Sequence, residues 1–326
     1  MSARLLVLAG AVAGCSFWMP GASYDGRPPP LTDEEEATRE RLRAHVDALA
    51  TQIGERNWPH YDRLERARDY VAEELRAAGL VTAMRPFAHR GETFHNVEAV
   101  LPGSAASVAC IVVGAHYDSV EGSPGANDNG SGVATLIEVA RAVRGRQAAP
   151  PVRFVAFANE EPPYFHTGDG MGSVAYARSF ADPPRQVRAM LSLETVGFYS
   201  DEPGSQRYPP LVGMLYPDRG DFIAFVANVR SRSLLRSVVA SFRRVATLPS
   251  EGAALPAFVP GVSWSDHRSF WDVGVPAVMV TDTAPFRDPH YHDASDTPEH
   301  LDYARMARLV TGLTEVVLTL GKEDAR

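Results

Sequence analysis

The spacing of apolar residues along the chain predicts two outer helices and then a hairpin. Thr32 begins a capping-box pattern, and the charged amphipathic segment after it is expected to be helical to about Ile53. From Tyr61, apolar residues recur at helical spacing until Gly79, which is well placed to end a second helix. Two extended segments separated by a turn-like sequence then predict a hairpin within residues 81–101.

Two continuously apolar runs further along the chain predict buried strands at residues 108–115 and 152–158. A helix is expected between them, at residues 130–144. This alternation is typical of a parallel or mixed sheet covered by helices. Because no internal repeat or second linker is found, we expect one α/β domain over residues 32–326. Further strands are expected at 189–196, 211–215 and 277–280, and further helices at 172–180, 221–245, 266–271 and 303–320.

The first 15 residues have the pattern of a signal peptide. Arg4 precedes an apolar run, 5–13, that is too short to span a bilayer. The run ends in a sequence similar to a bacterial lipoprotein box, in which Cys15 would be lipidated and become the mature N-terminus. We therefore expect an exported, membrane-anchored lipoprotein, periplasmic or on the cell surface, with a secreted protein as the alternative. Residues 16–31, rich in Gly and Pro, are expected to be a flexible tether.

Composition narrows the function classes. The chain is 45% hydrophobic, which is ample for a core, and its formal net charge of -8 gives no broad basic surface for nucleic acid. Membrane contact is expected only through the anchor. Without Cys15 only Cys110 remains, so no intrachain disulfide is expected and Cys110 is interpreted as a buried thiol. The sequence leaves the oligomeric state open.

Polar residues follow four of the expected strands. His116 comes directly after the first buried run, Glu160 and Glu161 after the second, and Glu194 after the apolar residues 189–193. The last strand is followed by a loop that contains His292. Ligand sites in open α/β sheets lie beyond the carboxyl ends of the strands, so we expect these side chains to gather there. A mixture of imidazoles and carboxylates suits zinc.

Four sequence motifs carry a resemblance to a known family. They are GAHYDS at 114–119, GANDNGSG at 125–132, NEE at 159–161 and PHYH at 289–292. In this order they resemble the family of aminopeptidase Y and bacterial leucyl aminopeptidase, which also includes glutamate carboxypeptidases and glutaminyl cyclases. The resemblance extends from about Leu42 to the C-terminus. It implies a three-layer αβα domain with a mixed, mostly parallel central sheet.

The resemblance also implies an active site with two zinc ions. Asp128 would bridge the ions, and the implied ligands are His116, Asp128, Glu161, Glu194 and His292. Glu160 would be the general base that deprotonates a metal-bridging water, which then attacks as hydroxide, and that protonates the leaving amine. Asp118 is placed to accept the proton of the other ring nitrogen of His116.

The implied activity is that of a zinc exopeptidase acting on peptides, with an aminopeptidase favoured over a carboxypeptidase or dipeptidase. A glutaminyl cyclase with one zinc is an alternative from a second enzyme class. A non-catalytic binding protein on the same fold is a third reading. A serine hydrolase is disfavoured because no serine lies in a Gly-x-Ser-x-Gly elbow.

Two features depart from the family pattern. The family often has Asp at the position of Glu194, and here residues 162–171 separate the glutamate pair from Gly172. We expect this insertion to lie over the cleft and to influence substrate choice, with Tyr164, Phe165 and His166 as candidates to line it. The sequence leaves several other roles open. Asp266 is a candidate substrate contact or, like Ser265, a helix N-cap, and His290 is a weaker ligand candidate than His292. A loop-structuring role is considered for Asp293 and Asp296, and an oxyanion-stabilising role for Tyr199 and Tyr216.

Overall fold

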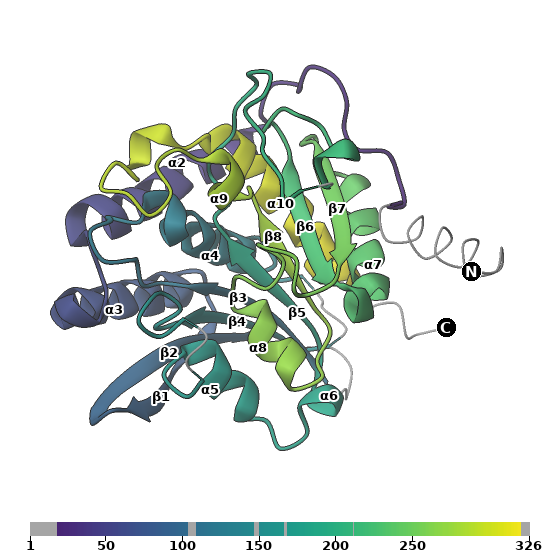
Figure 1. Cartoon of the computed structure of the whole chain (residues 1–326). Coiled ribbons are helices and arrows are strands. Elements are labelled where there is room, and N and C mark those ends of the chain that lie inside the picture. The colour runs from purple at the N-terminus through teal and green to yellow at the C-terminus, as the bar shows by residue number, and fades with distance from the viewer. Residues whose placement is uncertain (1–17, 104–108, 147–149, 166–167, 211, 321–326) are drawn as a thin grey trace.

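The computed structural model describes residues 18–103, 109–146, 150–165, 168–210 and 212–320. A central sheet lies between two sets of helices, which gives three layers (Figure 1). The described residues form eight strands in the order β1-β2-β4-β3-β5-β8-β6-β7. The predicted three-layer fold with a mixed, mostly parallel sheet is confirmed.

The strands pair in three groups. β4, β3, β5 and β8 are parallel to one another, and β6 and β7 are parallel to each other but antiparallel to β8. β1 and β2 form the predicted hairpin, whose second strand pairs antiparallel with β4. Their bounds are β1 Val81–His89, β2 Glu92–Leu101, β3 Cys110–His116, β4 Val152–Phe157, β5 Val187–Glu194, β6 Ile223–Asn228, β7 Ser250–Leu255 and β8 Ala277–Thr281.

The helices divide between the two faces of the sheet. One face is covered by α2 Asp33–Asp47, α3 Tyr61–Ala77, α4 Gly132–Ala142, α7 Arg232–Arg243 and α10 Tyr303–Leu320. The other face is covered by α5 Gly172–Arg178 and α8 His267–Asp272. Shorter helices are α6 Pro183–Gln186 and α9 Ala284–Arg287, and a π-helical segment, Ala48–Ile53, continues α2.

β3 shows why the central strands are apolar throughout. Every residue of β3 is buried, and alternate side chains enter different cores. Ile111 and Val113 belong to the core beneath α4 and α10, whereas Cys110 and Val112 belong to the core beneath α5 and α8. A strand covered on both faces has no polar side, so its sequence is a continuous apolar run.

The region between residues 211 and 255 differs from prediction. The prediction of a strand at 211–215 is wrong, since residues 212–214 form a short 3-10 helix. The helix expected at 221–245 begins only at Arg232, and residues 223–228 are strand β6. β7 was not predicted, because its sequence, SEGAAL, contains glycine and alanines, which have low strand propensity.

The N-terminal segment contacts the edge of the sheet where β7 lies. Met19 is buried beside Gly252, and the Ser23 hydroxyl accepts a hydrogen bond from the Ser250 N–H. Residues 19–23 of the expected tether are thus packed against the domain. The expected signal peptide and Cys15 lie outside the described residues. Among the helices that the structure describes, none is both long and apolar enough to cross a membrane.

The close approach of α10 to α7 generates a stability prediction. A Cβ at Gly312 of α10 would overlap the ring of Phe242, which is fully buried and packs edge-on against Phe225 at 5.0 Å between centroids. Gly312→Ala is therefore expected to lower the free energy of unfolding by about 1–3 kcal/mol despite the better helix propensity of alanine. Urea denaturation measures this. Thr311→Ala, on the exposed side of the same turn, should change it by less than about 0.5 kcal/mol. An equally stable Gly312→Ala protein would contradict the packing described.

Candidate metal centre

The parallel strands bring the predicted residues to one edge of the sheet. His116 is the last residue of β3 and Glu194 the last residue of β5, while Glu160 and Glu161 follow the neighbouring strand β4. Asp128 lies in a π-helical turn, Ala126–Ser131, that leads into α4. His292 completes the group from the loop after β8, so all predicted ligands face one another.

The donor atoms form two sets that share Asp128. His116 Nε2 lies 3.4 Å from Asp128 Oδ1 and 3.4 Å from Glu194 Oε2. His292 Nε2 lies 3.1 Å from Asp128 Oδ2 and 3.5 Å from Glu161 Oε2. Ligands about 2.0–2.1 Å from a tetrahedral zinc ion are roughly 3.3 Å from one another. The two oxygens of Asp128 thus face different imidazoles, as a bridging carboxylate requires.

Several of these atoms are buried without a hydrogen-bond partner in the described structure. They include both ring nitrogens of His116, Asp128 Oδ1 and Glu161 Oε1. Orphaned buried polar atoms are rare in native proteins because desolvation without a partner is costly. His116, Asp128 and Glu161 have ligand atoms close enough to hold one ion. The donor set and its orphaned atoms therefore fit a metal site.

The electrostatics of the centre also favour cations. Burial raises the pKa of Glu161 well above its ordinary value, and the charge of Asp128 raises it further. Burial also opposes ionisation of Asp128, but the nearby imidazoles of His116 and His292 outweigh it and lower the pKa of Asp128. Crowded carboxylates repel one another in a poorly solvated site, and a divalent cation relieves that repulsion.

Asp118 holds the glutamate pair by its backbone. Its Oδ1 accepts the N–H of Glu160 at 3.1 Å and its Oδ2 accepts the N–H of Glu161 at 3.0 Å. Asp118 Oδ1 lies 3.5 Å from His116 Nδ1, which is longer than an ordinary hydrogen bond. The residue is next to His116 as expected, and its observed hydrogen bonds fix the β4 loop.

Asp296 holds the other side of the centre in the same way. Its two oxygens accept the backbone N–H groups of Asn127, at 2.7 Å, and Asp128, at 3.0 Å. Burial raises the pKa of Asp296 to about 7. This is a loop-structuring role, and Asp293 structures the same loop by accepting the Ser295 N–H.

Ser265 supports Glu194, the predicted ligand at a position where the family often has aspartate. Its hydroxyl donates to Glu194 Oε2 at 2.6 Å and lies 3.0 Å from the Ser192 hydroxyl. The longer side chain is therefore held toward His116 by a hydrogen bond. Asp266 occupies the N-cap position of α8, as considered, but its side chain makes no capping hydrogen bond. The carboxyl of Asp266 is fully buried near the centre, and this burial raises its pKa to about 7.

Arg56 is a supporting residue that the sequence did not reveal. Its side chain is fully buried and donates to the carbonyl oxygens of Tyr117, Pro124 and Gly125. These bonds fix the loop between β3 and Asp128. Arg56 lies between two expected helices, in no motif, and only the folded structure reveals its partners.

The remaining candidate residues named from the sequence differ in their positions relative to the centre. The ring of His290 stacks on His300 at 3.8 Å, so His292 alone of the pair faces the centre. Tyr164 is buried and packs edge-on against Phe94, and its expected place in the cleft stays a prediction. His166 lies outside the described residues.

The tyrosines are placed differently from expectation. The hydroxyls of Tyr199 and Tyr216 donate to the backbone carbonyls of Val196 and Gly252. Tyr291, by contrast, stacks on His292 at 3.9 Å. Burial and then the charges of Asp128 and the nearby glutamates raise the pKa of Tyr291. The sequence offered a signal for Tyr291 only through its place in the last motif.

The fold and donor set are those of a metallopeptidase. Residues 96–317 match the model of peptidase family M28, and the chain belongs to this family of zinc exopeptidases. Its sequence is 37% identical over 286 residues to Uncharacterized protein YfbL of Escherichia coli (strain K12), covering 85% of this chain and 87% of that protein. It is 30% identical over 270 residues to a Probable leucine aminopeptidase of Arthroderma otae, covering 77% of this chain and 64% of that protein.

Solved structures share the fold at low sequence identity. BSAP, a zinc aminopeptidase from Bacillus subtilis, superimposes with a TM-score of 0.68 at 16% identity, covering 88% of this chain and 96% of that chain. A glutaminyl cyclase from Tannerella forsythia gives a TM-score of 0.61 at 19% identity, covering 86% of this chain and 98% of that chain. One fold therefore serves more than one reaction.

The two donor sets predict the zinc content. Because the sets share Asp128, purified protein loaded with zinc is expected to hold about two ions per chain, as in other two-metal sites. His116→Ala and His292→Ala should each reduce the content to about one ion or fewer. Mass spectrometry of the metal after dialysis measures this. His290→Ala, whose ring stacks on His300, serves as the matched control and should keep about two. A single ion in the unchanged protein would contradict the two-set geometry.

Proposed function

We propose that the protein is a two-zinc aminopeptidase, which hydrolyses the N-terminal residue from peptides. The observation that carries this proposal is the pair of donor sets that share Asp128. Membership of a zinc exopeptidase family supports it, and the names of the aminopeptidase relatives support cleavage from the amino end.

The residues of the chain divide the work of hydrolysis. Zinc ions held by the two sets would polarise the scissile carbonyl and supply a water that ionises near neutral pH. Glu160 is buried at the centre and lies outside both sets, with its Oε2 4.0 Å from His116 Nε2. In the proposed mechanism this carboxylate takes a proton from the attacking water and gives it to the leaving amine. Asp118 holds the backbone of Glu160 while this proton moves.

Two other functions are less well supported. A glutaminyl cyclase that uses one zinc needs only one donor set, whereas this chain has both His116 and Glu194 in place for a second. A non-catalytic binding protein on this fold has no need of Glu160, which is present and buried at the centre. Stoichiometric zinc and turnover of an unblocked peptide separate both from the proposed peptidase.

Glu160→Gln tests the mechanism. The amide keeps the shape of the side chain but accepts no proton, so kcat is expected to fall by about 10²–10⁴-fold while zinc content stays unchanged. Release of the N-terminal residue from short peptides measures kcat. N-acetylated peptides should resist cleavage by the unchanged protein, because an aminopeptidase acts on a free terminal amine.

A matched variant controls for the loss of a carboxylate. Glu121→Gln, at an exposed position of the neighbouring loop, should leave kcat at the level of the unchanged protein. Full turnover by Glu160→Gln would remove Glu160 from the mechanism. Cyclisation of N-terminal glutamine in place of hydrolysis would favour the cyclase.

We also propose that Cys15 carries a lipid anchor. The proposal rests on the lipobox-like sequence that ends at Cys15. In a bacterial host the protein is expected in the membrane fraction, and Cys15→Ser should move it out of that fraction, because a cleaved lipoprotein is held by the acyl chains on its N-terminal cysteine. Cys110→Ser, which changes a buried thiol, is the matched control and should stay with the membrane. Mass spectrometry that finds an unmodified Cys15 would contradict the anchor.

A further inference from the structure

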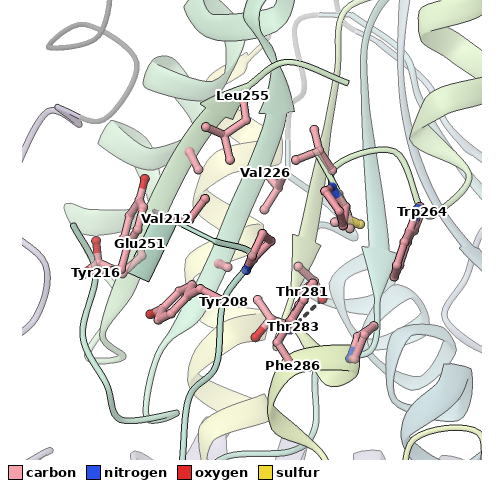
Figure 2. Close-up of a pocket in the computed structure, with 18 of the residues that line it drawn as sticks. Tyr208, Val212, Tyr216, Val226, Glu251, Leu255, Trp264, Thr281, Thr283 and Phe286 are labelled. Carbon is pink, nitrogen blue, oxygen red and sulfur yellow. Dashed lines mark hydrogen bonds between the residues drawn. The ribbon is translucent and has the colours of Figure 1, made fainter. Parts of the chain in front are cut away.

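An apolar pocket opens beside the metal centre, over the strands β8, β6 and β7. Glu194, Thr195 and Tyr291 line it where it meets the centre. Its floor consists of small or apolar side chains, which are Ala224, Val226, Ala253 and Met279. Figure 2 shows Trp264 on one side of the pocket and Glu251, Tyr208 and Tyr216 gathered on the other. Apart from Glu194 at the metal centre, Glu251 is therefore the one carboxylate that lines this mostly apolar pocket.

Glu251 and the metal ligand Glu194 belong to one row across the sheet. Glu194 pairs with Thr281, Thr281 with Ala224, and Ala224 with Glu251. Laterally paired residues point to the same face, so both glutamates point to the face on which the pocket lies. Three strand spacings of about 4.8 Å separate their backbones, which gives a span of about 14 Å.

Among the described residues, none forms a hydrogen bond or ion pair with the carboxylate of Glu251. Arg243 is a partly buried cation whose charge acts on Glu251, but it donates to the hydroxyl and carbonyl of Ser250, which points to the opposite face of β7. Burial raises the pKa of Glu251. The positive charge of Arg243 lowers this pKa, and the negative charge of Asp221 raises it further. A partly desolvated carboxylate without a partner gains free energy when a cation reaches it.

Two stacked tyrosines stand beside this carboxylate. The rings of Tyr208 and Tyr216 lie 5.9 Å apart between centroids at an interplanar angle of 25°. Burial and then the charge of Glu251 raise the pKa of Tyr216, in accord with the closeness seen in Figure 2. Aromatic faces next to a carboxylate favour ammonium and guanidinium groups.

One cation, Arg207, also lines the pocket, and it would attract an acidic side chain of the substrate. It is exposed, however, whereas Glu251 is partly buried, so water screens the charge of Arg207 more strongly. The partly buried charge of Glu251 is therefore expected to decide which substrate side chain the pocket favours.

The length of the pocket distinguishes the possible side chains. With bonds of about 1.5 Å, an extended arginine reaches roughly 7 Å from its α-carbon and leucine roughly 3 Å. From a scissile bond at the metal centre, leucine stays far from Glu251, while lysine or arginine approaches it with its methylenes against the apolar floor.

We propose that this pocket takes the side chain of the N-terminal substrate residue and that Glu251 selects arginine or lysine there. The inference rests on the proposed aminopeptidase function and deepens it by naming the substrate class. Glu251 is a specificity-determining residue that contacts the substrate's cation.

Matched aminoacyl substrates test the selection. Lysyl and norleucyl anilides share the same stem and differ only in the ammonium group. We expect kcat/KM to be at least about tenfold higher for lysyl than for norleucyl, from one charged hydrogen bond. Arginyl, leucyl and glutamyl anilides complete the set, with arginyl favoured.

Substitutions at Glu251 assign the preference to its charge. Glu251→Gln should lower the ratio of kcat/KM for lysyl over norleucyl by about 10- to 100-fold. Glu251→Asp keeps the charge and should keep most of the ratio. Glu202→Gln, at an exposed position outside the pocket, should match the unchanged protein on every substrate. Zinc content and the melting temperature show whether each variant is folded.

The outcomes separate this inference from the function on which it rests. If zinc-loaded protein hydrolyses none of these anilides, the aminopeptidase proposal is overturned. If it hydrolyses them but favours norleucyl, leucyl or glutamyl, or if Glu251→Gln leaves the lysyl preference unchanged, the selection by Glu251 is overturned and the aminopeptidase stands.

Discussion

The crowding of buried carboxylates around Asp128 is the constraint on which the rest of the structure depends. Carboxylates taken out of water repel one another unless cations or hydrogen-bond donors face them. The backbone meets this requirement at two points, because Asp118 accepts N–H groups from the β4 loop and Asp296 accepts them from the Asp128 turn. Arg56 adds a buried positive charge beneath the same loops. Both ring nitrogens of His116, with Asp128 Oδ1 and Glu161 Oε1, remain without hydrogen-bond partners among the described residues.

Much of the fold and of the centre followed from the sequence, for a definite physical reason. A strand buried on both faces is apolar throughout, so β3 and β4 are recognisable, and parallel pairing brings their ends together. His116 ends β3 and Glu161 lies in the loop after β4, so their proximity can be inferred from two local sequence patterns and one rule of topology. The roles assigned to them remain predictions until the metal and the variants are measured.

The rest depended on contacts that the sequence does not encode locally. Residues 222–227 are apolar without a clear period and precede a strongly amphipathic helix, so β6 was merged with α7. The β7 sequence is strand only because β6 pairs with it. Ser265 supports Glu194 from 71 residues away, and no spacing rule predicts such a pair. The insertion at 162–171 was expected to influence substrate choice, whereas the apolar pocket lies over the strands that the sequence identified least well.

The packing of the N-terminal segment on β7 has a consequence for solubility. β7 is at the end of the strand order, and a strand in that position offers free backbone groups to any other extended chain. Ser23 takes up the N–H of Ser250, and Met19 covers Gly252, where no side chain would otherwise shield the backbone. The residues before α2 thus hinder β7 from pairing with a strand of another molecule. A recombinant form that lacks these residues would expose this edge of the sheet to aggregation.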